Sequence, residues 1–223
     1  MAAYLSRLHH ISLHVSNAEK IANDLVSKFK FNLFATRLTD RSRQLALRKG
    51  AAVFVVNERA NQSSRNQVDT FLEKHRSPGI QHVGLYTKDI VSSAHAMAEA
   101  GVQFFSPPLA YYTKVGKQQE IEEAGHNPQM LAQHGILLDT DLHQDPSSQT
   151  ASSKNKRYLL QVFTKPIFAE DTFFLELIER RGATGFGEGN IKALWRSVQA
   201  HMENEKGDSQ GEEPPKSVKT AHY

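Results

Sequence analysis

Apolar and polar residues alternate near the start of the chain, in LHHISLHV at 8–15. Alternation of this kind indicates a half-buried strand, because successive side chains of a strand point to opposite faces. The following segment, 18–31, places Ile21, Leu25 and Phe29 four residues apart. That spacing puts the three side chains on one face of a helix. The pattern therefore predicts a strand followed by an amphipathic helix.

Two further strand-like runs follow the predicted helix, which Asn17 can cap at its start. They are RQLALR at 43–48 and AAVFVVNE at 51–58, and the Lys-Gly pair at 49–50 between them is typical of a hairpin turn. The segment 31–36 is a candidate for one additional strand. The first part of the chain is thus predicted to have the order β-α-β-β, or β-α-β-β-β with the extra strand.

The same order of elements begins again further along the chain. After a short predicted helix at 67–75, IQHVGLYT at 80–87 alternates like a strand, and 89–101 has the pattern of a helix. Aligning the two strands sets His10 against His82, which gives an internal repeat of 72 residues. A β-α-β-β-β unit cannot cover its own sheet face alone. We therefore expect an α+β fold in which two such units pair and close a curved barrel around a central cavity.

Polar stretches divide the chain. ANQSSRN at 60–66 is almost free of apolar residues, and LHQDPSSQTASSKNKR at 142–157 is rich in Ser, Gln and Lys. Further strands are predicted at 136–139, 158–165 and 172–180, and a helix near the end of the second unit. The predicted organisation is a first unit at 4–58, a linker at 59–66, a second unit at 67–200 with a mobile loop at 142–157, and a disordered tail at 203–223.

The composition is that of a globular protein and narrows the chemistry in one respect. Hydrophobic residues make up 39% and charged residues 23%, with a net charge of only +3. The basic residues form no stripe, so nucleic acid is not expected as a partner. There is no cysteine, but there are 11 histidines. A metal site must therefore use histidines and carboxylates.

No run of residues approaches the ~18 apolar positions that a membrane span needs, and MAAYLSRLHH lacks the apolar core of a secretion signal. We therefore expect a soluble intracellular protein without a membrane span. Arg7 stands among 18 residues that contain no acid, which is compatible with mitochondrial import.

Glu176 is the only charge inside the apolar run FFLELI, at a position that alternates with Phe174 and Ile178. A carboxylate among apolar strand residues is costly to bury unless it is paired, hydrogen-bonded or bound to a metal. It would bind a metal together with His82, or lie on an edge strand in a salt bridge with a residue such as Arg180. His82 would be a metal ligand or a hydrogen-bonded strand histidine. These alternatives stay open on spacing alone.

Long motifs from 66 to 199 resemble the C-terminal half of 4-hydroxyphenylpyruvate dioxygenases, in the vicinal-oxygen-chelate superfamily. They are SPGIQHVGLYTKDI, FFSPPLAYY, GILLDTD, YLLQVFTKPIF and TFFLELIERRGATGFGEGN. The resemblance implies a glyoxalase-like fold of paired units and an Fe(II) cofactor. Members of the family have four β-α-β-β-β units, whereas this chain has about two, as if the middle units were lost between Asn57 and Asn66.

The resemblance also implies ligands for the iron. The His of the QHxxL motif is His82, and the Glu of the FLExI motif is Glu176. The strand that carries the family's first histidine has no counterpart here. His10 occupies the matching position of a homologous unit and is our hypothesis for the third ligand, with His9 and His14 as nearby competitors.

By the same resemblance, the substrate is 4-hydroxyphenylpyruvate, which is decarboxylated and hydroxylated with O₂. Four amide side chains are expected to hydrogen-bond the substrate, namely Asn57, Gln67, Gln81 and Gln161. Phe163 is expected to form part of an apolar wall. Ile191 replaces the Phe of the family's GFGxGNF motif, as in hydroxymandelate synthases. We therefore expect 4-hydroxymandelate as product, with homogentisate as the alternative.

A second class of function is a binding module. In that case the chain is a catalytically impaired paralogue that keeps the barrel and binds a ligand or a protein. For the enzyme, the expected partners are an aromatic 2-oxo acid and O₂, with a homodimer left open as the assembly. The resemblance favours a mitochondrial location, with the cytoplasm as the alternative.

Overall fold

The computed structural model describes residues 5–39, 42–60, 66–140, 157–168, 172–183, 187 and 190. In these ranges the chain forms eight strands and six helices. The predicted loop at 142–157 and tail at 203–223 lie outside the described residues, apart from Arg157. So does the helix predicted at the end of the second unit, apart from Asn190. No helix of the described part is long and apolar enough to cross a membrane.

The first unit follows the order predicted from its pattern. It consists of β1 (Leu5–His14), α1 (Ala18–Phe29), β2 (Asn32–Leu38), β3 (Ser42–Lys49) and β4 (Ala52–Arg59). The Asn17 side chain caps α1 by accepting a hydrogen bond from the Lys20 amide at 2.8 Å. Gly50 forms the β3–β4 turn with a φ of 57°, a value that glycine adopts without steric cost. Arg59, predicted to start the linker, is the last residue of β4.

The second unit repeats this order with an insertion. Its elements are α2 (Gln67–His75), β5 (Gly79–Thr87), α3 (Ile90–Glu99), α4 (Ala110–Thr113), α5 (Val115–Glu123), α6 (Pro128–His134), β6 (Leu137–Thr140), β7 (Tyr158–Phe163) and β8 (Phe174–Arg181). The three helices α4 to α6 were not predicted. They are short, and α4 and α5 begin without a side-chain cap, so their sequence carries little of the usual helix signal.

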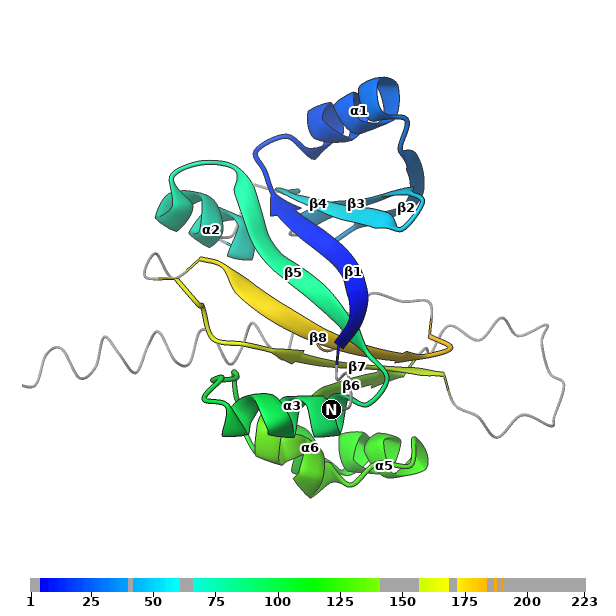
Figure 1. Ribbon diagram of the computed structural model, residues 1–223, viewed down its shortest axis with the longest axis vertical. Coiled ribbons are helices and arrows are strands. Elements are labelled where there is room, and N and C mark those ends of the chain that lie inside the picture. Colours follow the sequence, from blue (N-terminus) through cyan, green and yellow to red (C-terminus); the bar gives the residue numbers. More distant parts are fainter. Residues whose placement is uncertain are drawn as a thin grey trace, which may run out of the picture.

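The two units share one sheet, in which the strands have the order β2-β3-β4-β1-β5-β8-β7-β6. The antiparallel pair β1–β5 joins the units, while β1–β4 and β5–β8 are parallel. The sheet is curved, with the first unit at one end and the second at the other (Figure 1). The predicted pairing of two units is therefore confirmed. The predicted closure is wrong, because β2 and β6 are edge strands and the described sheet stays open.

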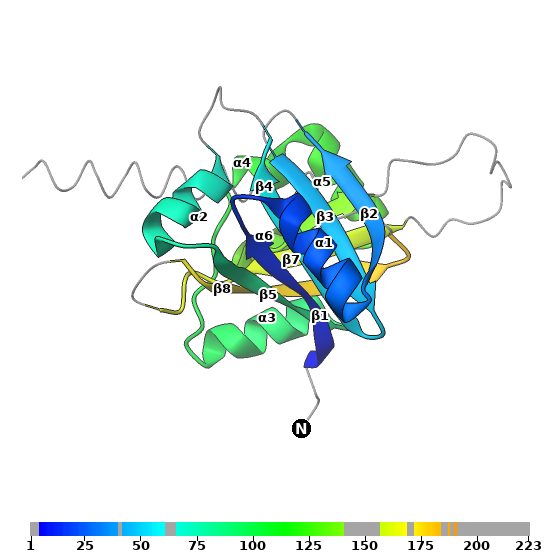
Figure 2. The same cartoon turned by 90° about the horizontal axis from the view of Figure 1, so that it is seen from above.

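Helices cover the outer face of each half of the sheet. Helix α1 packs its Ala18 and Ala22 against Leu45, Leu47 and Val56 of the first unit. In the second unit, α3 to α6 pack on the sheet in a larger core, which contains Ile90, Tyr112, Ile121, Leu131, Leu138, Leu160, Val162 and Leu177. Figure 2 shows α1 and α3 on opposite sides of the β1–β5 junction. Apolar burial thus fixes which face of each strand points outward.

Strand alternation then dictates what lines the inner face. In β8, Leu177 faces the helices, so Glu176 and Ile178 face inward. In β7, Leu160 and Val162 face the helices, and Gln161 therefore faces inward. The inner face carries polar and charged side chains around a cavity, and the candidate chemistry lies there.

Candidate metal centre

Three neighbouring strands supply one cluster of metal-binding side chains on the inner face. His10 comes from β1, His82 from β5 and Glu176 from β8, and these strands are adjacent in the sheet. In register, Gly84 pairs with His10 on one side and with Glu176 on the other. A Cβ at Gly84 would lie 2.5 Å from the His10 ring. The missing side chain therefore makes room for His10 to lean over β5 towards the other two residues.

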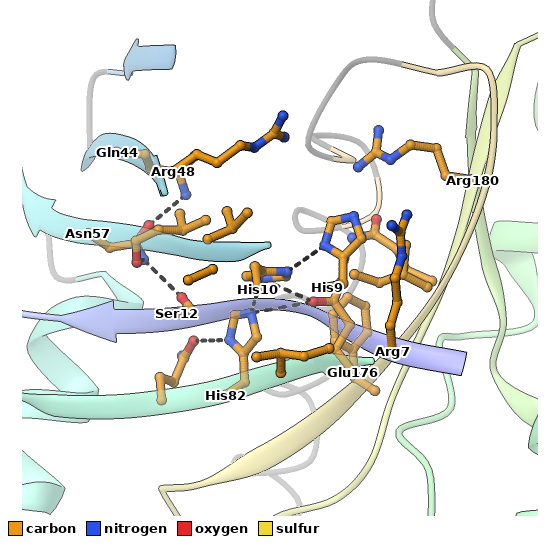
Figure 3. Close-up of a pocket in the computed structure, with 18 of the residues that line it drawn as sticks. Arg7, His9, His10, Ser12, Gln44, Arg48, Asn57, His82, Glu176 and Arg180 are labelled. Atoms are coloured by element: carbon orange, nitrogen blue, oxygen red, sulfur yellow. Dashed lines mark hydrogen bonds and ion pairs between the residues drawn. The ribbon is translucent and has the colours of Figure 1, made fainter. Parts of the chain in front are cut away.

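The donor atoms of these three residues point toward one another (Figure 3). His10 Nε2 lies 3.1 Å from His82 Nε2. Glu176 Oε2 lies 3.5 Å from His10 Nε2 and 3.4 Å from His82 Nε2. Two ligands at about 2.1 Å from a metal are about 3.0 Å apart at a right angle and about 3.4 Å apart at a tetrahedral angle. The cluster is thus spaced as the ligands of one ion would be.

Burial and neighbouring charges set the protonation states of the donor atoms. Glu176 is 2% exposed. Burial by itself raises the pKa of Glu176, but the hydrogen bond with His82 and the nearby His10 and His82 rings outweigh it and lower the pKa to about 2. Burial lowers the pKa of His10 to about 3, against the attraction of Glu176. At neutral pH the carboxylate is ionised and the His10 ring is neutral, which are the forms that bind a metal.

Each of the three residues is also held from its far side. Gln81 Oε1 lies 2.8 Å from His82 Nδ1, and His9 Nδ1 lies 2.9 Å from His10 Nδ1. Gln161 Nε2 donates to Glu176 Oε1 at 2.5 Å. With a metal bound, a proton on Nδ1 of His82, shared with the Gln81 carbonyl oxygen, would leave the Nε2 lone pair for the ion. Partners of this kind fix the orientation of metal ligands.

A further layer holds Gln161. Its Oε1 accepts a hydrogen bond from Asn190 Nδ2 at 2.9 Å. A Cβ at Gly187 would lie 1.9 Å from the same oxygen, so a side chain there would displace the Gln161 amide, and its φ of 71° also favours glycine. Both residues belong to the GFGEGN motif. One structural role of that motif is therefore to let Gln161 reach Glu176.

Two imidazoles and one carboxylate on one side, with open positions opposite, are the donor set of non-haem iron(II) sites. Within the described residues, His10, His82 and Glu176 are the group that offers ligand atoms within 4.8 Å of one another. Burying this carboxylate without a partner would be costly, and an ion in the cluster would satisfy it. The side chains thus fit a divalent metal.

The cluster opens into a cavity of about 870 Å³ on the inner face. Phe174 stacks on His82 with ring centres 4.9 Å apart, and Phe163 lies edge-on to Phe174 at 6.2 Å. These two rings form an apolar wall beside the metal ligands. The first unit forms the opposite part of the lining with Ser12, His14, Gln44, Val53, Val55 and Asn57.

The four amides expected to meet the substrate all line the cavity. Gln81 and Gln161 contact the candidate metal ligands directly, as described above. Asn57 accepts from Gln44 Nε2 at 2.8 Å and donates to Ser12 Oγ at 3.0 Å. Gln67 is the first residue of α2. Ile191 lies outside the described residues.

Several residues of the lining were not predicted from the sequence to line a cavity. Burial lowers the pKa of His9 to about 4 although Glu176 raises it, and Arg180, Arg7 and Arg48 lower it further. His9 and the three arginines line the cavity, as does Phe174. Alternation on β3 and β8 would have found Arg48 and Arg180, because they share a face with Gln44 and Glu176. The interpretation of Glu176 as an edge-strand residue is wrong, since β8 lies between β5 and β7.

The matching curated proteins include 4-hydroxyphenylpyruvate dioxygenases and 4-hydroxyphenylpyruvate dioxygenase-like proteins. The 4-hydroxyphenylpyruvate dioxygenase-like protein of Homo sapiens is 55% identical over 135 residues, which are 60% of this chain and 33% of the human protein. The protein of the same name from Mus musculus is 50% identical over 145 residues, or 65% and 36% of the two chains. The 4-hydroxyphenylpyruvate dioxygenase of Sus scrofa is 31% identical over 152 residues, or 66% and 35%. This chain therefore spans about a third of the length of these relatives.

Solved structures agree with the sequence matches. A triple mutant of 4-hydroxymandelate synthase from Streptomyces coelicolor superposes with a TM-score of 0.71 at 26% identity, over 89% of this chain and 55% of the synthase. A fusion protein of a xylose isomerase-like TIM barrel and a 4-hydroxyphenylpyruvate dioxygenase superposes with a TM-score of 0.64 at 22% identity, over 89% and 30%, and supports the fold alone. No family profile matches the chain. Sequence and fold together confirm the resemblance of this chain to 4-hydroxyphenylpyruvate dioxygenases and their dioxygenase-like relatives.

Proposed function

We propose that this protein is an Fe(II)-dependent oxygenase that acts on an aromatic 2-oxo acid, with 4-hydroxyphenylpyruvate as its substrate. The observation that carries the proposal is the convergence of His10, His82 and Glu176 at the wall of an 870 Å³ cavity. The names of the relatives support the reaction class and the substrate. Because the chain covers about a third of those proteins, its own activity has to be measured.

The three ligands would hold the iron on one side and leave its other positions facing the cavity. Fe(II), when bound, would supply coordination positions for the 2-oxo acid and O₂ and would mediate electron transfer to O₂, with the substrate as the net reductant. His9, Gln81 and Gln161 keep the ligand side chains oriented. Rigid ligands preserve the geometry between substrate and oxidant, on which the rate of such a reaction depends.

The remaining lining residues would position the aromatic part of the substrate. Phe163 and Phe174 offer ring faces and edges next to His82. On the opposite side, Gln44, Asn57 and Ser12 form a chain of hydrogen bonds that presents polar atoms to the cavity. An aromatic acid bound between these walls would have its ring on the apolar side and its polar substituent towards the amides.

For the product we propose 4-hydroxymandelate, formed with loss of CO₂, with homogentisate as the alternative. The support is Ile191 in GFGEGNI, where the dioxygenases carry Phe, together with the likeness to a 4-hydroxymandelate synthase structure. A smaller side chain at that position would let the ring sit differently relative to the oxidant, and a shift of about 1 Å is enough to redirect reaction. Chromatography of the products from 4-hydroxyphenylpyruvate would decide, and homogentisate alone would refute the preference.

Oxygen consumption tests the reaction itself. Purified protein is loaded with Fe(II), and O₂ uptake is recorded on addition of 4-hydroxyphenylpyruvate. We expect uptake that matches substrate consumed and that disappears in Glu176→Ala. Tight Fe(II) binding without any uptake would refute the proposed activity.

A binding module is the second candidate, and the open sheet favours it. Strands β2 and β6 do not meet in the described part of the chain, so the cavity lacks the closure that usually keeps water out of such a site. A module of this kind would bind the metal and the acid but consume no O₂. The mitochondrial location, the cytoplasmic alternative and the homodimer stay predictions, for which cell fractionation and sedimentation are the measurements.

A further inference from the structure

His14 is a buried polar residue of the cavity lining that the metal centre does not use. It lies on β1, on the same face as His10 and Ser12, and is 1% exposed. Within the described part of the chain its ring forms no hydrogen bond. Buried polar groups nearly always have a partner, because water is no longer there to supply one. A partner for this ring has to come from the cavity.

The residues around His14 offer it no hydrogen bond. Phe71 of α2 lies edge-on to its ring, with the ring centres 5.3 Å apart. In register, its neighbours on the adjacent strands are Asn57 and Gly79, and Gly79 has no side chain. Nδ1 of His14 is fully buried, so Nε2 is the nitrogen that a molecule in the cavity can meet.

The other polar groups on this side of the cavity are already engaged with one another. Asn57 accepts a hydrogen bond from Gln44 and donates to Ser12 Oγ at 3.0 Å and to the Leu13 carbonyl oxygen at 3.1 Å. A ligand group would have to compete with these bonds, whereas at His14 it would complete an unfilled pair. His14 is therefore the residue here that gains most from a polar ligand atom.

The chemistry of the His14 ring limits what that ligand atom can be. Burial lowers the pKa of His14 to about 3, and the nearby His82 acts in the same direction, so the ring is neutral at pH 7. A neutral imidazole presents an N–H or a lone pair at Nε2, depending on its tautomer. A hydroxyl group can accept from the one and donate to the other. A hydroxyl thus satisfies His14 in either tautomer.

His14 is also placed away from the metal ligands. It is four residues after His10, which is about 13 Å along an extended strand. A ligand that reaches both the metal and His14 is therefore elongated, with its acid at one end and its hydroxyl group at the other. An aromatic 2-oxo acid hydroxylated in the para position has this shape.

We propose that His14 binds the ring hydroxyl group of the substrate through Nε2 and thereby selects 4-hydroxyphenylpyruvate over phenylpyruvate. This inference rests on the proposed function for the metal and the 2-oxo acid, and it adds the residue that recognises the opposite end of the ligand. An acid without the hydroxyl group would leave the His14 ring unpaired in its buried site. A site built for a polar group discriminates in this way against an analogue that lacks it.

Anaerobic calorimetry tests the inference without turnover. Fe(II)-loaded protein is titrated with 4-hydroxyphenylpyruvate and with phenylpyruvate, and we expect the hydroxylated acid to bind about ten-fold more tightly. His14→Phe should remove this preference and bind phenylpyruvate at least as tightly as the wild type. His14→Gln keeps a donor and an acceptor and should retain part of the preference. Both variants should bind Fe(II) like the wild type, because His14 is not among the candidate metal ligands.

A matched control lies on the other side of the same aromatic contact. His75 stacks on Phe71 with ring centres 4.8 Å apart, is exposed and does not line the cavity. His75→Phe should therefore keep the full preference. The preference is a ratio of two affinities in one protein, so a loss of stability in a variant does not alter it.

Two results would overturn the inference and leave the proposed function intact. One is equal affinity of the two acids for the wild-type protein, as expected if a water molecule serves His14 instead, and this comparison needs no variant to fold. The other is a full preference that survives in His14→Phe or, should that variant not fold, in His14→Leu. Absence of binding by both acids would instead refute the proposed function, and the inference with it.

Discussion

The two units of this protein carry the same histidine but not the same carboxylate. His10 and His82 occupy equivalent positions of the internal repeat, 72 residues apart. In the second unit, the residue two places after His82 is Gly84, which pairs with Glu176. The matching pair in the first unit is Ser12 with Val55. The repeat therefore supplies two histidines but only one carboxylate.

This difference explains why the site has three ligands and open positions. A glutamate at Val55 would place a second carboxylate on the equivalent strand of the first unit. With valine there, that side of the cluster is apolar and faces the cavity. Pairing two similar units thus builds the symmetric part of a metal site, and divergence between the units leaves room for a substrate.

Loss of the single carboxylate should have the largest effect. We expect Glu176→Ala to weaken Fe(II) binding more than about 100-fold, beyond the range typical for residues that only orient ligands. Calorimetric Fe(II) titration under nitrogen measures it, with Glu99→Gln on the exposed side of α3 as a control. Affinity within ten-fold of the wild type would show that the ion does not use this carboxylate.

The equivalence of the two histidines can be tested next. His10→Ala and His82→Ala should each weaken Fe(II) binding by about 100-fold, because both rings present Nε2 to the same point. The same titration measures both variants. Should His10→Ala bind like the wild type while His82→Ala does not, the first unit would hold no ligand and the hypothesis for His10 would fail.

Gly84 distinguishes the second unit from the first, where Ser12 is at the matching place. Gly84→Ala adds a Cβ that would lie 2.5 Å from the His10 ring, so we expect His10 to be displaced and Fe(II) affinity to fall by about ten-fold. Urea unfolding of the metal-free protein provides the control for stability. An unchanged Fe(II) affinity would mean that His10 does not depend on this space.

The smallest expected effect concerns His14 of the first unit, whose equivalent in the second is Tyr86. Burial lowers the pKa of His14 to about 3. Below pH about 6.5 the unfolded chain takes up a proton that the folded chain excludes, so the free energy of unfolding falls as the pH is lowered towards 3. His14→Phe should therefore reduce the pH dependence of unfolding by up to about 1.4 kcal/mol per pH unit in this window.

Urea unfolding of the metal-free protein at about pH 7, 6 and 5 measures this difference in slope. His95→Gln is the matched control, because that ring is exposed on α3. Identical slopes for the wild type and His14→Phe would show that His14 is protonated to the same extent in the folded and unfolded chains.

Much of the fold is readable from local patterns. The alternation at 8–15 and 80–87 corresponds to β1 and β5. The periodicity at 18–31 corresponds to α1, and Asn17 caps the start of that helix as predicted. These features depend on which face of an element is buried, and that leaves a mark on the sequence. The helices at 110–134 show no such pattern in the sequence, because they are short and lack a regular apolar repeat.

The sequence by itself determined that two similar units exist, that a metal could be held only by histidines and carboxylates, and that His82 and Glu176 stand in motifs of a dioxygenase type. Tertiary structure alone decided that the sheet stays open, that β1, β5 and β8 are neighbours, and that His10 meets the other two ligands. It also decided that Arg48 of β3 lines the same cavity as Glu176 of β8. The physical reason is that strand pairing brings together residues far apart in the chain, and no local pattern records which strands will pair.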